Sequence, residues 1–219
     1  MQSEESRRIT GWFFVVGAVL LWAGWWLLPV RIGTFFVAGD FAAVHDAWHQ
    51  FVWVYRAHIF GLVIGIMGFA ALAALDSEDE IRVFLWPGAA VAALGLAVGA
   101  LGEAFYYHHG AWGALQLDEA PANVVATYVQ GLRLDTEYVT CLVRFSRVFF
   151  GLGQLVLAAA FLKWRLVPSV LGWAAVVLGV AAMLLTMAFG DNLEYYRPVF
   201  HLNAAWLAAL GGVMLRRRP

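Results

Sequence analysis

Three of the six histidines fall in the stretch from His45 to His58, which leads directly into an uncharged apolar run. That run, Ile59 to Leu75, has only 17 residues, whereas a helix needs about 20 to cross the hydrocarbon core of a bilayer. A spanning helix must therefore begin earlier and carry Arg56 and His58 below the membrane surface. Because an ionisable side chain at that depth is costly, it indicates a functional site.

Four more ionisable residues lie at comparable depth in other apolar segments: Glu103, Arg144, Arg147 and His201. With the helical rise of about 1.5 Å per residue, His58 lies roughly 12 Å below the surface and the other four roughly 6–13 Å. Five residues from four helices can thus meet at one level of the membrane. The sequence predicts a single buried polar site there.

Three chemistries fit this group. Two histidines on different helices, His58 and His201, can ligate the iron of a haem b from both sides, while Arg144 and Arg147 pair with the propionates. Alternatively, Glu103 pairs with one of the two arginines, the histidines add hydrogen bonds, and the network pins the helices together. A proton path is the third reading of the same residues.

The other histidines suggest a metal ion as an alternative to haem. His45 and His49 have the i, i+4 spacing that places two imidazoles on one helix face, but they lack the glutamate of the metalloprotease pattern. His108 and His109 follow Glu103 near the end of the third apolar segment. His45, His49, Glu103, His108 and His109 are the candidate metal ligands. The alternative for His108 and His109 is that they adjoin the loop and are simply solvated.

The composition places these residues in a polytopic membrane protein. Of 219 residues, 63% are hydrophobic and 13% are charged, and the mean hydropathy is +0.74. An average soluble domain has about 25% charged and 45–50% apolar residues. The chain has a net charge of -1 and no basic stripe, so nothing suggests a nucleic acid as a partner. The single cysteine, Cys141, excludes an internal disulfide.

Six apolar segments predict an all-α fold, a polytopic membrane bundle of six transmembrane helices in one domain. The expected helices cover approximately residues 10–30, 50–75, 82–107, 138–162, 166–190 and 196–215. A long outer loop is expected at 110–137, with a short surface helix at Ala122–Leu134 inside it. A connection of that length is typically functional or a docking surface.

A weak internal repeat suggests a duplicated helical hairpin. Ile59-Phe-Gly-Leu62 is similar to Phe149-Phe-Gly-Leu152, and Phe105-Tyr-Tyr107 is similar to Glu194-Tyr-Tyr196. Chance similarity between helices rich in alanine, leucine and glycine remains the alternative explanation.

The distribution of basic residues predicts the orientation. Six spans put both termini on one side, together with the turns around Arg82 and Lys163/Arg165, and this side carries most of the basic residues outside the spans. The positive-inside rule then predicts that both termini lie in the cytoplasm. The expected location is the bacterial inner membrane. All six histidines then lie on the outer side.

The segment Arg147-Val-Phe-Phe-Gly-Leu-Gly-Gln-Leu155 through Pro168-Ser-Val-Leu-Gly172 resembles a group of uncharacterised bacterial six-helix membrane proteins with a Pro-x-x-Leu-Gly step. That resemblance covers about seventy residues; it implies six helices and no catalytic residue. The leading functional hypothesis is a haem- or metal-binding subunit in electron transfer. The alternatives are a non-catalytic accessory subunit that docks on other membrane subunits, and a small-molecule or proton transporter.

Overall fold

The structure, a computed structural model, consists almost entirely of helices and describes residues 4–27, 44–75, 78–117, 119–189 and 193–216. The helices, with their bounds, are α1 (Glu4–Trp26), α3 (Trp48–Ala74), α4 (Asp79–Phe105), the π-helix η1 (Tyr106–Trp112), α5 (Gly113–Gln116), α6 (Ala122–Gly131), α7 (Arg133–Lys163), α8 (Ser169–Phe189) and α9 (Leu193–Leu215). No strand occurs within these described ranges, which confirms the all-α fold.

Six helices in the described ranges are long and apolar enough to cross a membrane: α1, α3, α4 with its extension, α7, α8 and α9. The chain is therefore a multi-pass membrane bundle. Two of the spans are longer than a bilayer requires. Helix α4 continues through η1 and α5 to Gln116 as a 38-residue span, and α7 has 31 residues; about 20 residues cover the hydrocarbon core.

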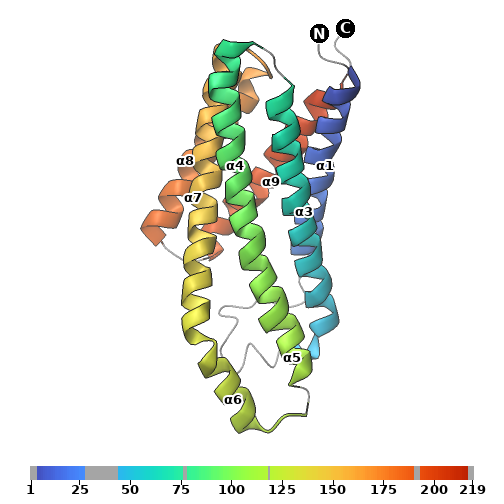
Figure 1. Ribbon diagram of the computed structural model, residues 1–219, viewed down its shortest axis with the longest axis vertical. Coiled ribbons are helices and arrows are strands. Elements are labelled where there is room, and N and C mark those ends of the chain that lie inside the picture. Colours follow the sequence, from blue (N-terminus) through green and yellow to red (C-terminus); the bar gives the residue numbers. More distant parts are fainter. Residues whose placement is uncertain (1–3, 28–43, 76–77, 118, 190–192, 217–219) are drawn as a thin grey trace.

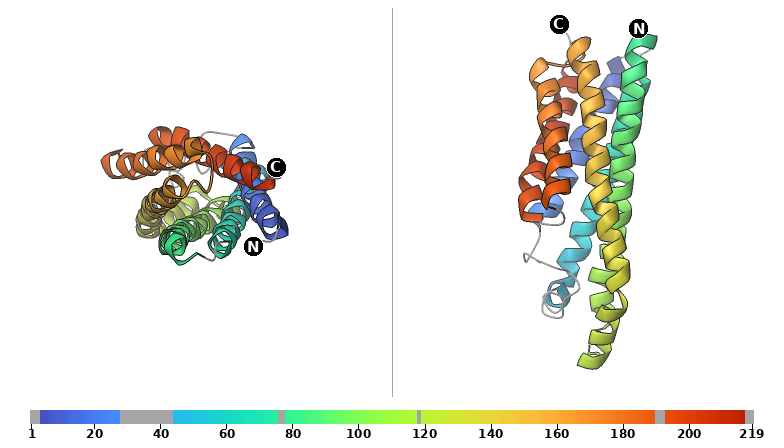
Figure 2. Two further views of the ribbon diagram at one scale, coloured as in Figure 1. Left: turned by 90° about the horizontal axis from the view of Figure 1, so that it is seen from above. Right: turned by 90° about the vertical axis from the view of Figure 1, so that its left-hand side faces the viewer.

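Residues 110–137, expected to form a loop, are mostly helical. Helix α4 continues into them through η1 and α5, α6 forms within the expected surface helix, and α7 begins at Arg133 instead of near Tyr138. The cause is tertiary: Ala111 and Ala114 pack with Phe51 and Val52 of α3 in a small separate core. This contact extends the helices well beyond α1, α8 and α9 at one end of the bundle (Figures 1 and 2).

The six spanning helices form a closed ring. Neighbours around the ring are α1, α3, α4, α7, α8 and α9, and α9 packs again on α1. The start of α1 and the end of α9 lie at the same end of the bundle (Figure 1). This end is called the terminal end below, and the other the distal end.

Glycines allow close helix contacts in this ring, as small residues do in membrane proteins. A Cβ on Gly17 of α1 would lie 3.0 Å from the carbonyl oxygen of Gly61 in α3, and a Cβ on Gly151 of α7 only 2.6 Å from that of Gly179 in α8. Gly61 and Gly151 hold equivalent positions in the two similar Phe-Gly-Leu segments, yet they face different neighbours in the ring. The hairpin duplication therefore stays a prediction.

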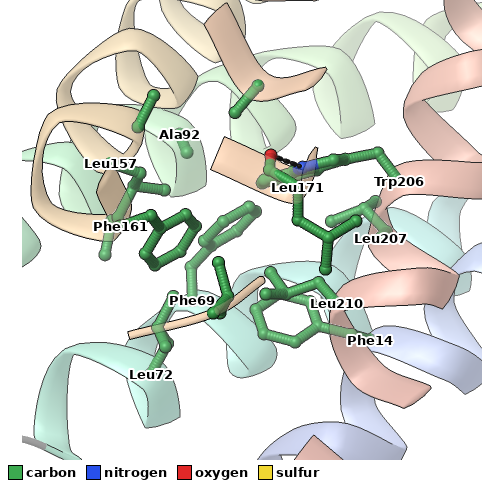
Figure 3. Packing of buried hydrophobic residues seen from close by; sticks show 14 of the residues in the cluster. Phe14, Phe69, Leu72, Ala92, Leu157, Phe161, Leu171, Trp206, Leu207 and Leu210 are labelled. Atoms are coloured by element: carbon green, nitrogen blue, oxygen red, sulfur yellow. Dashed lines mark hydrogen bonds between the residues drawn. The ribbon is translucent and has the colours of Figure 1, made fainter. Parts of the chain in front are cut away.

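Aromatic and aliphatic side chains fill the ring towards the terminal end (Figure 3). Phe14 of α1 meets Phe69 of α3 edge-on with ring centroids 5.1 Å apart, and Phe69 meets Phe150 of α7 in the same way at 6.0 Å. Trp206 of α9 donates a buried hydrogen bond of 3.0 Å to the carbonyl oxygen of Leu171 in α8. A packed apolar core thus fills the bundle interior on this side.

Candidate functional site

The buried polar residues of the bundle interior centre on His58. This residue lies three turns into α3, where neighbouring helices leave its imidazole only 5% exposed. Its Nδ1 atom lies 3.6 Å from Oε2 of Glu103 on α4, the next helix in the ring. The Glu103 side chain is 29% exposed, so the pair joins a buried imidazole to a carboxylate that retains contact with the surroundings.

Helix α1 closes the other side of His58. A Cβ on Gly24 would overlap Cδ2 and Nε2 of the imidazole, so only glycine at position 24 leaves space for the His58 side chain. The next residue, Trp25, has its ring centroid 6.2 Å from that of His58. His58 Nε2 is buried there without a hydrogen-bond partner. The two ring nitrogens therefore have different surroundings: Nδ1 faces an acid, and Nε2 faces α1.

Helix α9 brings a second histidine to the same aromatic group. His201 and Phe200 lie 5.6 and 5.4 Å from Trp25 between ring centroids, and Phe200 also lies 6.0 Å from His58. Arg197, one turn earlier, places its guanidinium carbon 5.1 Å from the centre of the Trp25 ring, a cation–π contact. His58 and His201 are thus gathered around one indole, as part of one site.

The two arginines of α7 do not share a position. Arg147 is buried, and its guanidinium lies over the Tyr196 ring of α9 at 4.2 Å, whereas Arg144 is exposed. Glu103 contacts His58, and its expected pairing with one of these two arginines stays a prediction. Sequence alone does not rank these partners of Glu103, because His58 and both arginines lie at similar estimated depth and the order of the helices does not follow from it.

A polar pair that sequence reasoning did not single out lies deeper in the bundle. Gln154 of α7 is fully buried and donates through Nε2 a 2.8 Å hydrogen bond to Oδ1 of Asn203 on α9. This contact lies seven residues beyond the contact of Arg147 with Tyr196 on both helices, since α7 and α9 run parallel. The sequence signal for such a pair is an uncharged amide within an otherwise apolar run.

The expected metal ligands are dispersed. His45 lies 3.5 Å from Asp46, His49 stacks on Trp48, His108 contacts His109, and Glu103 belongs to the His58 pair. No group of three or more His, Cys, Asp or Glu side chains suited to a metal ion occurs in the part of the chain that the structure describes.

His109 is instead tied to the helix that follows. Its carbonyl oxygen accepts a 3.2 Å hydrogen bond from the Tyr128 hydroxyl of α6, and its Nδ1 lies 3.4 Å from the same hydroxyl. Burial against η1 raises the pKa of Tyr128 above its ordinary value. Arg56 donates a 3.1 Å hydrogen bond to the Tyr107 hydroxyl in η1. These contacts hold the distal helices together, outside the His58 site.

Comparison with known proteins adds no family or structural relative: no protein-family model, curated protein or solved structure matches the chain. The site is therefore interpreted from its own chemistry.

Proposed function

We propose that this protein is an integral membrane subunit that binds and releases a proton at the His58–Glu103 pair. The observation that carries the proposal is the contact of a buried imidazole with a partly exposed carboxylate, 3.6 Å apart, inside a ring of spanning helices. Ionisable residues inside membrane bundles are rare and mark ion pathways and proton relays.

The pair is suited to holding a proton because an imidazole and a carboxylate 3.6 Å apart can share one between them. With one proton, the pair is either imidazolium with carboxylate or neutral imidazole with carboxylic acid, and both forms have no net charge. Losing or gaining a proton leaves a net charge in a region of low dielectric constant, where a charge is costly. Protonation of this pair therefore changes the free energy with which α3 and α4 pack.

The proton reaches the pair from the distal end only. This direction is supported by the partial exposure of Glu103 and by the packed rings of Phe14, Phe69 and Phe150, which lie across the interior towards the terminal end. A one-sided site supports proton-linked binding or sensing in a membrane complex rather than conduction through the bundle. With both termini in the cytoplasm of a bacterial cell, as we propose from the basic residues, the exposed side of the pair faces the outer side of the inner membrane.

A haem or metal cofactor is the second candidate. It is favoured by His58 itself, since a metal-bound histidine typically directs its other nitrogen at a carboxylate, and Nε2 is buried without a partner. However, the imidazole packs on Gly24, and Trp25 and Phe200 occupy the space beside both histidines. These rings would have to move before His58 and His201 face one iron, so the geometry supports the proton site better.

An accessory subunit remains compatible with either candidate. Several tryptophans are exposed on the outer surfaces of the helices, and lipid or a neighbouring subunit can cover them: Trp12, Trp53, Trp86 and Trp173.

The proposal is tested by nitrogen NMR of the protein labelled with ¹⁵N-histidine, recorded across pH. We expect the His58 signals to titrate, and the titration to change in Glu103→Gln but not in Glu137→Gln, a matched change at an exposed glutamate of α7. A His58 ring that keeps one protonation state, or that titrates identically in both variants, contradicts it. A Soret absorption band or bound metal lost in His58→Ala would instead establish the second candidate.

A further inference from the structure

Three buried nitrogen atoms around the Trp25 indole have no hydrogen-bond partner within the described ranges: Trp25 Nε1, His58 Nε2 and Arg197 Nε. They come from α1, α3 and α9, three helices that share one corner of the ring. Buried polar atoms in native proteins are almost always paired, so three orphans around one side chain indicate a missing partner.

The types of these atoms define the chemistry of that partner. The indole and guanidinium nitrogens only donate hydrogen bonds. His58 Nε2 also donates when the ring is protonated, because both ring nitrogens then carry a hydrogen. Glu103 is already in contact with His58 and lies on α4, away from the other two donors. The missing partner therefore supplies acceptor oxygen atoms.

The surroundings of these donors are aromatic. Phe200 and His201 lie 5.4 and 5.6 Å from the Trp25 ring between centroids, and His201 stays partly exposed. All three belong to spanning helices. A flat, uncharged group with oxygen acceptors, carried by a lipid-soluble molecule, matches both the donors and the rings.

We propose that this corner binds the head group of a membrane-soluble quinone, with a carbonyl oxygen accepting from Trp25 Nε1 and Arg197 Nε. The quinone then lies beside the His58–Glu103 pair and is an additional ligand of the proposed proton site. The inference concerns binding alone and includes no electron transfer. A long-chain carboxylate offers similar oxygens and would pair with the Arg197 guanidinium, but it has no flat ring to pack against Trp25 and Phe200.

The test is calorimetric titration of the purified, detergent-solubilised protein with ubiquinone-1, and separately with decanoate. We expect saturable binding of the quinone, weakened about five- to tenfold in Trp25→Phe, as expected for one lost hydrogen bond. Arg197→Gln should weaken it similarly. Trp53→Phe, which changes an exposed tryptophan on α3, should bind as the parent protein does. Circular dichroism establishes that each variant is folded.

Several results would overturn the inference. These are no saturable quinone binding by the folded parent protein, equal affinity in Trp25→Phe and the parent, or saturation by decanoate without quinone binding, which would identify a fatty carboxylate as the occupant. Each of these outcomes can be distinguished from a failure of the proposed proton site, because the His58 titration is measured without added quinone.

Discussion

Gly24→Ala is the change that probes the His58 site most sharply. A Cβ at this position overlaps Cδ2 and Nε2 of His58 and lies 3.1 Å from its Cγ. The imidazole is held between α1 and the carboxylate of Glu103, so it can only yield by moving off the pair or by pushing α1 outward. The first movement alters the 3.6 Å contact between Nδ1 and Oε2, and the second loosens the packing of α1 on α3 that buries the imidazole.

The expected loss of stability follows from two opposing terms. Overfilling a packed interior costs about 1–3 kcal/mol, whereas replacing glycine by alanine within a helix gains up to about 1 kcal/mol. Gly212→Ala isolates the second term, because a Cβ on Gly212 in α9 meets no atom within 4 Å. The difference between the two variants should therefore be about 1–3 kcal/mol, with Gly24→Ala the less stable.

The assay is equilibrium unfolding in mixed micelles of dodecyl sulfate and a mild detergent, followed by circular dichroism. In addition, the NMR titration of His58 should change in Gly24→Ala and stay as in the parent in Gly212→Ala. Equal stability of the two variants, together with an unchanged His58 titration, would refute the packing of His58 on α1.

Three further predictions concern the rest of the bundle. Trp206→Phe removes the hydrogen bond to Leu171 and leaves space where the indole was buried, so it should cost more than the roughly 0.5–1.5 kcal/mol of the bond alone in the same unfolding assay; exposed Trp173→Phe is the control, and equal effects would speak against the buried, bonded indole. Gln154→Leu and Asn203→Leu should be coupled by about 0.5–1.7 kcal/mol, so strict additivity would contradict their contact. In a Cys141→Ser background, Asn123→Cys should react with an impermeant maleimide added to intact cells and Ser169→Cys should not; the reverse pattern would invert the proposed orientation.

The helix count could be predicted because it depends on local hydropathy. Each spanning segment carries a long apolar run, and the structure has six such helices. The ends were harder to predict. Helix α4 continues to Gln116 because Ala111 and Ala114 find partners on α3, and no local pattern in a polar stretch reveals such a distant contact.

For the site, depth could be estimated from sequence but partners could not. Counting residues from the expected helix starts placed His58, Glu103 and His201 at one level, and the structure gathers them at one end of the ring. The contact of His58 with Glu103 depends on helix order and rotation, which residue spacing does not fix. The importance of Gly24 follows only from the His58 imidazole that packs on it, and this contact is not visible in the sequence.

The central claim, proton exchange at His58–Glu103 from the distal end alone, is tested most directly by infrared spectroscopy of oriented proteoliposomes. The pH is changed between about 4 and 9, a range that brackets ordinary carboxyl and imidazole titration, on one side of the membrane at a time. We predict a carboxylic acid C=O band that follows the pH on the distal side, is absent in Glu103→Gln and titrates differently in His58→Gln. A band that follows the pH on the terminal side, or no band sensitive to Glu103→Gln from either side, would contradict the account.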